Sequence, residues 1–395
     1  MLMKRFIFSV FVAALGLTSC GSDDSPAPPP PPDGTDQTVF MYLPWSDNLT
    51  DFFEKNIANF ESVVAQGTLH NERILVFFAE SPAKATLFEL VQNGDACERK
   101  MLKSYDNPAF TTAQGIASIL KDVKAFAPAK RYGMTIGCHG MGWLPIPGSA
   151  RGEVGQRYHW EYEGEVMTRF FGGTKPEHRV EVSTLVEGIT QAEMKMEYIL
   201  FDDCYMSSIE VAYDLRNVTD HLISCPTEIM ADGMPYANIG KHLIGTVDYA
   251  AVCDEFHKFY SDYRVPSGTI GVTDCRELDA LVPIMKEINA RFTFDQSKIK
   301  SVQSMDGYTP VIFFDYGDYV AKLCGDAELL ERFSAQLDRA VPPQCRKHTG
   351  TYPTSMGGFR TLPIKAYSGI TTSDPSVNPM AVTAKTATAW YKATH

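Results

Sequence analysis

The 395-residue sequence lacks the patterns of several common functional classes. Its nine cysteines include no CxxC pair, which argues against zinc ribbons and thioredoxin-like redox sites. It has no HExxH motif, so a metal-dependent hydrolase of that kind is poorly supported. Basic residues are outnumbered by acidic ones, and the net charge is −12. This balance argues against nucleic acid as a partner, because phosphate binding needs clustered Lys and Arg.

Long apolar runs are also missing, and the one at the N-terminus is short. After Lys4 and Arg5, residues 6–17 form an apolar stretch of 12 residues, whereas a membrane span needs roughly 20. A basic start, a short apolar core and small residues before Cys20 predict a secretory signal. Residues 17–20 resemble the lipobox of bacterial lipoproteins, in which the signal is cut before a cysteine that carries diacylglycerol. An ordinary signal peptide that ends near a cysteine is the alternative.

A proline-rich segment follows this signal. Five consecutive prolines, Pro28 to Pro32, hold the backbone extended and lack the donors for helices or sheets. We therefore expect a signal peptide at 1–19 and a lipidated Cys20 with a semi-rigid tether at 20–37. The expected location is the outer membrane or the cell surface, with the protein exported and held to the membrane through the lipid on Cys20.

Apolar runs alternate with amphipathic segments in the rest of the chain. Buried strands are predicted at residues 38–43, 74–78, 132–138, 196–201, 222–224 and 269–273. Helices are predicted at residues 51–64, 112–125, 183–192, 206–215 and 280–288. This alternation indicates an α/β fold with a mostly parallel, six-stranded core sheet covered on both faces. We expect a main domain at 38–300 and a smaller C-terminal α+β subdomain at 301–395, packed on it.

Two of the predicted strands end in residues that can carry chemistry. The third strand is followed by His139 and Gly140, and the fourth leads to Cys204. Ligands of open α/β sheets bind outside the carboxyl ends of the strands, and neighbouring strands lie about 4.8 Å apart. A thiolate nucleophile needs a nearby histidine, and the N–H groups of Gly140 and Cys204 could form an oxyanion hole. A helix that starts near Met206 would favour the thiolate further.

Each of these residues, taken alone, has a simpler explanation. A cysteine at a strand end is usually a small packed side chain, and a histidine is usually a satisfied polar group. Here, however, one predicted strand is followed by a histidine beside a glycine, and the next by two aspartates and a cysteine. Finding both at neighbouring strand ends favours a catalytic pair.

The segments His139–Trp143 and Phe201–Met206 resemble the clostripain family of cysteine peptidases, which belongs to the same clan as caspases. The resemblance implies a caspase-like three-layer sandwich and peptide hydrolysis through a thioester. It also implies that His139 and Cys204 form the catalytic dyad and that the partner is a protein or peptide substrate. No further cofactor is required, although the resemblance raises calcium as one; no metal-site spacing stands out in the sequence.

The family cleaves after Arg or Lys through acidic residues in its specificity pocket. By resemblance, Asp202 and Asp232 are the substrate-binding candidates, and Asp203 could serve instead of Asp202. Asp202 could also be a turn residue that caps the following helix. Segment Glu228–Ala231 departs from the Pro-Gly-rich form common near this position, which puts the basic specificity in doubt.

Several family members cut their own chain between the two catalytic segments. Here that connection contains a small-residue loop with Arg151 and Arg157 as candidate bonds, and Lys175 and Arg179 follow. Such loops are preferred sites of nicking, and an ordinary active-site loop is the simpler explanation. We expect a monomer. The rival hypothesis is a catalytically inactive, peptidase-like surface lipoprotein that binds a partner.

Overall fold

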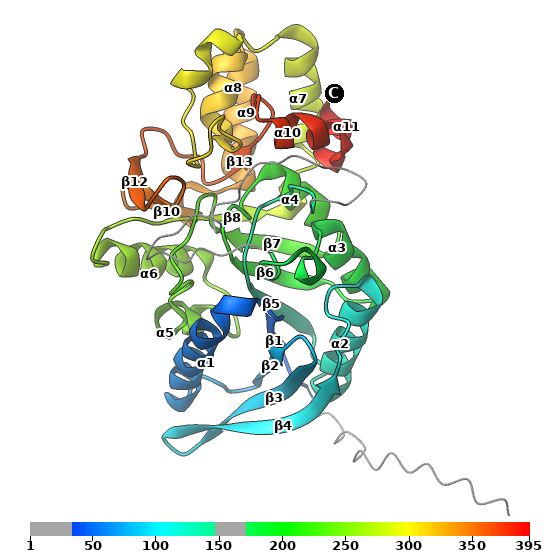
Figure 1. The fold of residues 1–395 in the computed structure, drawn as a ribbon. Helices are drawn as coiled ribbons and strands as arrows, with labels where there is room; N and C mark the ends of the chain where they lie inside the picture. The colour runs from blue at the N-terminus through cyan, green and yellow to red at the C-terminus, as the bar shows by residue number, and fades with distance from the viewer. Residues whose placement is uncertain (1–33, 147–170) are drawn as a thin grey trace, which may run out of the picture. The chain divides into compact units, whose positions relative to one another are not determined.

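A nine-stranded sheet runs through residues 34–146 and 171–395, the parts of the chain described by this computed structural model. The strand order is β10-β8-β7-β6-β5-β1-β2-β3-β4 (Figure 1). The strands of this sheet are β1 (Gln37–Leu43), β2 (Glu72–Ser81), β3 (Lys84–Asn93), β4 (Ala96–Asp106), β5 (Arg131–Gly137), β6 (Met196–Asp202), β7 (Thr219–Ser224), β8 (Thr269–Asp274) and β10 (Arg346–His348).

The centre of the sheet is parallel and its margins are antiparallel. Strands β7, β6, β5, β1 and β2 run in one direction. Strands β3 and β4 on one side, and β8 and β10 on the other, pair antiparallel. The six predicted strands correspond to β1, β2 and β5 to β8, so the prediction of a mostly parallel core is confirmed. Because parallel strands end at one edge, the carboxyl ends of β5 and β6 meet there.

Helices cover both faces of this sheet and complete the three layers (Figure 1). On one side lie α1 (Thr50–Ala65), α5 (Tyr236–Ile239) and α6 (Tyr249–Ser261). On the other side lie α2 (Ala113–Phe126), α3 (Val182–Gln191) and α4 (Ile209–Leu215). Helix α2, for example, buries Ile116, Leu120 and Val123 along one apolar stripe.

The C-terminal part of the chain adds helices and short strands. These are α7 (Leu281–Arg291), β9 (Phe314–Asp315), α8 (Tyr316–Leu323), α9 (Ala327–Ala340), β11 (Thr351–Thr354), β12 (Arg360–Pro363), β13 (Thr371–Thr372), α10 (Pro379–Ala384) and α11 (Ala389–Thr394). Strand β10 leaves this part and extends the main sheet beside β8. The division expected at residue 300 remains a prediction from the sequence.

One helix prediction needs correction, and one helix was missed. The helix expected from Met206 begins only at Ile209, because the side chain of Ser208 accepts the N–H of Val211 and caps the helix there. Helix α6 was not predicted, although its buried residues Val252, Cys253, Phe256 and Tyr260 recur at helical spacing. The signal was present but was diluted by the charged residues between them.

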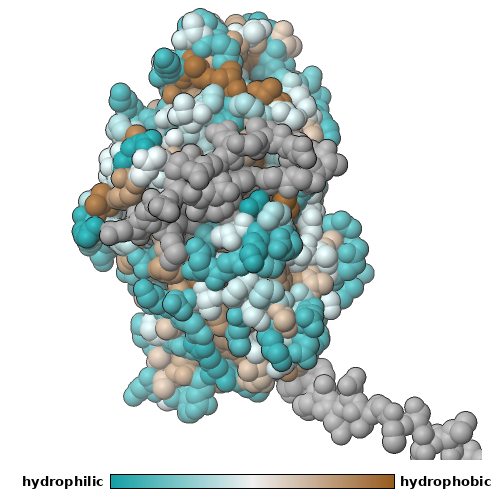
Figure 2. Space-filling view, in the orientation of Figure 1, coloured by the Kyte–Doolittle hydropathy of each residue, from teal (hydrophilic) through white to brown (hydrophobic). Residues whose placement is uncertain are grey.

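The surface of the described residues is largely hydrophilic, as Figure 2 shows for one face. Apolar residues on this face gather mainly near the top of the view. Every helix in the described residues is too short or too polar to span a lipid bilayer.

Candidate active site

The register of β5 and β6 places His139 and Cys204 at equivalent positions on neighbouring strand ends. Gly137 at the end of β5 pairs with Asp202 at the end of β6. His139 and Cys204 each follow two residues later. Both side chains are fully buried.

Asp203 joins the two loops that carry these residues. The backbone N–H of Cys138 donates to Asp203 Oδ1 (2.7 Å), and the Cys138 thiol lies 3.5 Å from Oδ2. Gly142 adds a second contact between the loops: its φ is +60°, and a Cβ there would lie 2.8 Å from the Tyr205 carbonyl oxygen. Only glycine allows this close approach of the two backbones. Because the Asp203 carboxylate holds Cys138, it is poorly suited to the substrate-binding role left open for it.

His139 is oriented from a third strand end. Its Nε2 lies 2.8 Å from Asn48 Oδ1, in the 3₁₀ turn Asp47–Leu49 that follows β1. With the amide oxygen as acceptor, Nε2 carries the proton and Nδ1 is the basic nitrogen of the neutral ring. The backbone N–H of His139 donates to the Gly172 carbonyl (3.2 Å). Sequence reasoning missed Asn48, although a polar residue just past an apolar strand at the same sheet edge was the available signal.

Backbone groups, rather than a helix end, surround the Cys204 thiol. The N–H of Ile229 donates to Cys204 Sγ at 3.3 Å. The sequence predicts a helix starting near Met206 that places its positive end beside the thiol and favours the thiolate. Helix α4 begins only at Ile209, five residues after Cys204, so that prediction is wrong. A hydrogen bond from an N–H group to sulfur stabilises the thiolate relative to the thiol. Gly140 is buried beside His139 in the same loop, and its oxyanion role stays a prediction.

The two candidate specificity aspartates differ in exposure. Asp202 is fully buried; Asn56 Nδ2 donates to its Oδ2 (2.8 Å) and the Met234 N–H donates to its Oδ1 (2.7 Å). The Asp232 side chain is 38% exposed, accepts a hydrogen bond from Tyr263 and lies 3.9 Å from Lys55 Nζ.

One turn brings these two aspartates into the same region of the fold. Asp232 lies two residues before Met234, whose N–H binds Asp202. On the other side, helix α1 supplies Lys55 and Asn56 as neighbours in sequence. Because the Asp232 side chain is partly exposed and that of Asp202 is fully buried, Asp232 is the more accessible carboxylate of the two.

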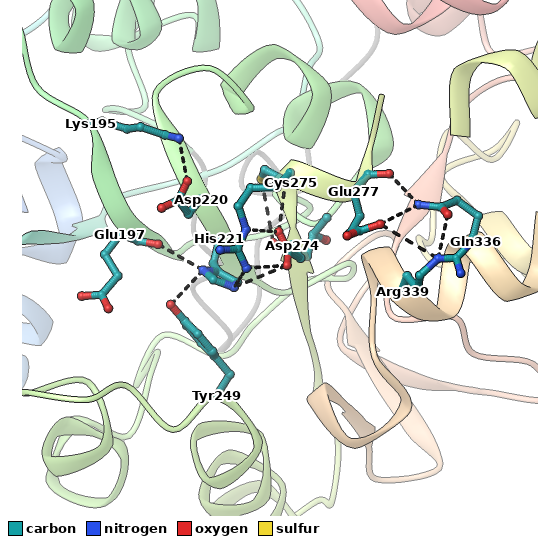
Figure 3. A network of polar contacts seen from close by, with 12 residues as sticks. Lys195, Glu197, Asp220, His221, Tyr249, Asp274, Cys275, Glu277, Gln336 and Arg339 are labelled. Atoms are coloured by element: carbon teal, nitrogen blue, oxygen red, sulfur yellow. Dashed lines mark hydrogen bonds and ion pairs between the residues drawn. The ribbon is translucent and has the colours of Figure 1, made fainter. Parts of the chain in front are cut away.

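A second histidine lies at the opposite edge of the sheet (Figure 3). His221 in β7 is paired in register with Asp274 of β8, and its Nδ1 contacts Tyr249 Oη (2.9 Å). Burial is the largest influence on the His221 pKa and lowers it. The network continues through Lys195 and Asp220, which form an ion pair of 2.6 Å. Because this edge holds the amino ends of the parallel strands, His221 cannot pair with Cys204.

Several predicted residues lie outside the described part of the chain, namely Cys20, Arg151 and Arg157. Of the later candidates, Lys175 is exposed, and Arg179 Nη2 donates to the Thr174 carbonyl (2.5 Å). The described residues contain no group of three or more His, Cys, Asp or Glu that could hold a metal ion. The calcium that the resemblance raised remains an expectation from the sequence.

Several known proteins are similar to this chain. The model of the clostripain family matches residues 41–338. No curated protein matched the chain. An X-ray structure of a secreted C11 cysteine protease from Bacteroides thetaiotaomicron, "iotapain", is 55% identical, with a TM-score of 0.84; the match covers 92% of this chain and 100% of that one.

Two further structures are similar. A clostripain from Bacteroides thetaiotaomicron ATCC 29148, in complex with the peptide inhibitor BTN-VLTK-AOMK, is 57% identical with a TM-score of 0.55, over 57% of this chain and 99% of that one. An inactive zymogen C11 protease from Parabacteroides distasonis is 24% identical with a TM-score of 0.76, over 92% of this chain and 99% of that one, and shows likeness of fold.

Proposed function

Because this chain belongs to the clostripain family and is a cysteine-type peptidase, we propose that it hydrolyses peptide bonds through Cys204 and His139. The observation that carries the proposal is the pairing of Gly137 with Asp202, reinforced by the bond from Cys138 to Asp203. Together these contacts hold the two loops side by side at the edge of the sheet where α/β folds bind ligands.

The reaction begins with attack of Cys204 Sγ on the carbonyl carbon of the scissile bond. The thiol proton passes to His139, which then protonates the leaving amine as the C–N bond breaks. The N–H groups of Gly140 and Cys204 stabilise the negative oxygen during attack. Water then hydrolyses the thioester, with His139 accepting its proton, and the free thiol returns.

A basic residue before the scissile bond fits the acidic groups at Asp202 and Asp232. Carboxylates recognise a guanidinium or ammonium group by charge-assisted hydrogen bonds. Asp232 is the accessible member and makes the direct contact, whereas Asp202 holds the neighbouring turn through Met234. The name of the inhibitor bound to the 57% identical relative ends its peptide part in K, the letter for lysine, which supports this preference.

Self-processing at Arg151 or Arg157 is the second element of the proposal. The burial of both catalytic side chains supports a precursor whose covering residues must move before substrate enters. In the sequence, Arg151 and Arg157 lie between the His139 and Cys204 segments, so a cut there would place the two segments on separate chains. Incubation of the purified chain, followed by mass spectrometry, tests this; Arg151→Ala/Arg157→Ala should remain intact at those bonds.

We further propose that the protein is exported and held to the membrane by lipid on Cys20, and that it acts as a monomer. The N-terminal sequence supports export, as does the 55% identical relative, which is described as secreted. The proposed reaction requires no cofactor, so activity should survive a chelator; loss of activity with a chelator and recovery with added calcium would contradict this.

An inactive, peptidase-like binding module was the rival interpretation of the sequence, and membership of a cysteine peptidase family argues against it. A positional peptide-library digest with the wild type and Cys204→Ala separates the two, and it also reveals the preferred residue at the cleavage site. We expect cleavage by the wild type and none by Cys204→Ala. Cys275→Ala is the matched control, because Cys275 is a buried cysteine at the opposite sheet edge and should keep activity. Hydrolysis that persists in Cys204→Ala would refute the assignment of the nucleophile.

A further inference from the structure

Glu228 is a buried carboxyl group that the proposed chemistry does not use. Its side chain is 1% exposed and lies in the loop after β7. Burial is the largest influence on its pKa and raises it. A buried ionisable group is costly unless its neighbours satisfy it, so the identity of those neighbours is informative.

Four donors satisfy the Glu228 carboxyl group. Tyr205 Oη (2.8 Å) and Thr354 Oγ1 (2.7 Å) donate to Oε1. The backbone N–H (2.9 Å) and the hydroxyl (2.8 Å) of Ser355 donate to Oε2. Glu228 therefore links Tyr205, the residue after Cys204, to Thr354 at the end of β11 and to Ser355. Thr354 lies 126 positions after Glu228 in the chain.

Tyr205 has a backbone conformation that needs such support. Its φ is +60°, in the left-handed region that residues other than glycine rarely adopt. Its N–H donates to the Thr227 carbonyl (3.0 Å), and its ring stacks on Phe313 with centroids 4.9 Å apart. A conformation of this kind persists only where the surroundings hold it from several sides.

The loop that carries Glu228 also reaches the thiol. Ile229, the next residue, donates its N–H to Cys204 Sγ at 3.3 Å. Three consecutive residues, Thr227 to Ile229, thus contact Cys204 or Tyr205. A shift of Glu228 would therefore move the donor at sulfur and release the strained residue beside it.

We propose that Glu228 is a positioning residue for Cys204. Its carboxyl group, bound to Tyr205 on one side and to Thr354 and Ser355 on the other, holds the turn that carries the nucleophile. Glu228 does not touch the reacting atoms and acts through its neighbours. The inference rests on the proposed peptidase function, because it assigns a task within that site.

The test measures kcat per active site, titrated with an irreversible Cys204 probe, in the full chain. Glu228→Ala should lower kcat about 100-fold, as a misplacement of about 1 Å does, with KM changed less than about twofold. Glu228→Gln keeps the shape and one acceptor for the Ser355 N–H, and the Tyr205 and Thr354 hydroxyls can turn to accept from its amide; we expect a loss within about fivefold.

Tyr205→Phe tests the link itself. It removes the hydroxyl that donates to Glu228 while keeping the ring on Phe313, and it should lower kcat per site as well. The double variant Tyr205→Phe/Glu228→Ala should be no slower than Glu228→Ala, because both changes break one connection. If the loss of kcat in the double variant equals the product of the losses in the two single variants, the link through Tyr205 is wrong.

Glu89→Gln is the matched control, because Glu89 is also buried but pairs with Arg73 (2.6 Å) near the amino ends of the parallel strands. It should lower Tm and leave kcat per site unchanged. If Glu228→Ala only reduces the titratable fraction and keeps the wild-type kcat per site, the positioning role is wrong. A wild-type chain without peptidase activity would instead refute the proposed function, so the two failures are distinguishable.

Discussion

The backbone N–H of Cys138 donates a 2.7 Å hydrogen bond to the Asp203 carboxylate, so the residue before Cys204 holds the residue before His139. This contact joins the ends of β5 and β6 beyond their last paired residues, Gly137 and Asp202. The spacing of the catalytic pair therefore depends on a side chain that takes no part in the chemistry.

Removal of the Asp203 carboxylate should separate the two loops. Asp203→Ala is expected to lower kcat about 100-fold, because misaligned reacting groups are that costly. Asp203→Asn should lose less, since its amide oxygen still accepts the Cys138 N–H. Asp220→Asn, at the opposite edge beside Lys195, is the control and should keep kcat. Wild-type turnover in Asp203→Ala would contradict the role of this contact.

Asn48 should matter through the orientation of His139. Asn48→Ala removes the acceptor 2.8 Å from Nε2 and is expected to lower kcat about tenfold by freeing the ring and its tautomer. Asn48→Asp should shift the acidic limb of the kcat/KM profile to higher pH, because a carboxylate stabilises the imidazolium. The pH profile of each variant checks this, with the exposed Asn217→Ala as control. An unshifted limb in Asn48→Asp would argue against the contact.

Asp232 should govern the choice of residue before the scissile bond. Asp232→Asn is expected to reduce the kcat/KM ratio of a lysine substrate to its norleucine analogue about fivefold. Tyr263→Phe should reduce the ratio less, because it only loosens the carboxylate. Lys55→Met should raise the ratio about twofold, since an exposed cation 3.9 Å from Asp232 competes weakly with substrate. A ratio unaffected by Asp232→Asn would exclude this carboxylate from recognition.

Glu210 makes stability depend on pH. Burial, and then the nearby Asp374, raise the pKa of Glu210 from 4.5 to about 7. Ser373 N–H and Thr372 Oγ1 donate to its Oε1. Between pH 4.5 and about 7 the folded state keeps a proton that the unfolded state releases, so stability falls as pH rises.

The neutral variant Glu210→Gln should escape this loss. At pH 8 it is expected to be more stable than the wild type by up to about 3 kcal/mol, and at pH 4.5 the two should be similar. Thermal unfolding at both pH values measures the difference. The exposed Glu331→Gln should show no pH-dependent gain; an equal gain at both pH values in Glu210→Gln would contradict the explanation.

Cys20 should decide attachment to the membrane. Cys20→Ser is expected to lose incorporation of labelled fatty acid. In a detergent phase-partitioning experiment it should move from the detergent phase to the aqueous phase, because acyl chains supply the membrane affinity. Cys97→Ser, which changes a partly exposed cysteine of β4, should partition as the wild type does. A Cys20→Ser variant that stays in the detergent phase would exclude this anchor.

Local patterns located most of the fold and two members of the site. The apolar runs marked β1, β2 and β5 to β8, and the ends of β5 and β6 pointed to His139 and Cys204. The antiparallel margin strand β10 was missed because three half-buried residues give almost no periodic signal. The contacts of Asn48 with His139 and of Glu228 with Thr354 were missed. These partners lie 91 and 126 positions apart in the sequence, and local patterns give no signal for contacts over such separations.

By itself, the sequence determined the α/β class, the positions of the six central strands along the chain, and the presence of His139 and Cys204 just after two of those strands. These follow from periodic burial and from residue chemistry, which act over a few neighbouring positions. Only the tertiary structure decided that Asp203 ties the loops, that Ile229 donates to the sulfur and that Glu228 supports Tyr205. Those contacts form between distant segments, and their geometry exists only once the sheet register and the packing around it are set.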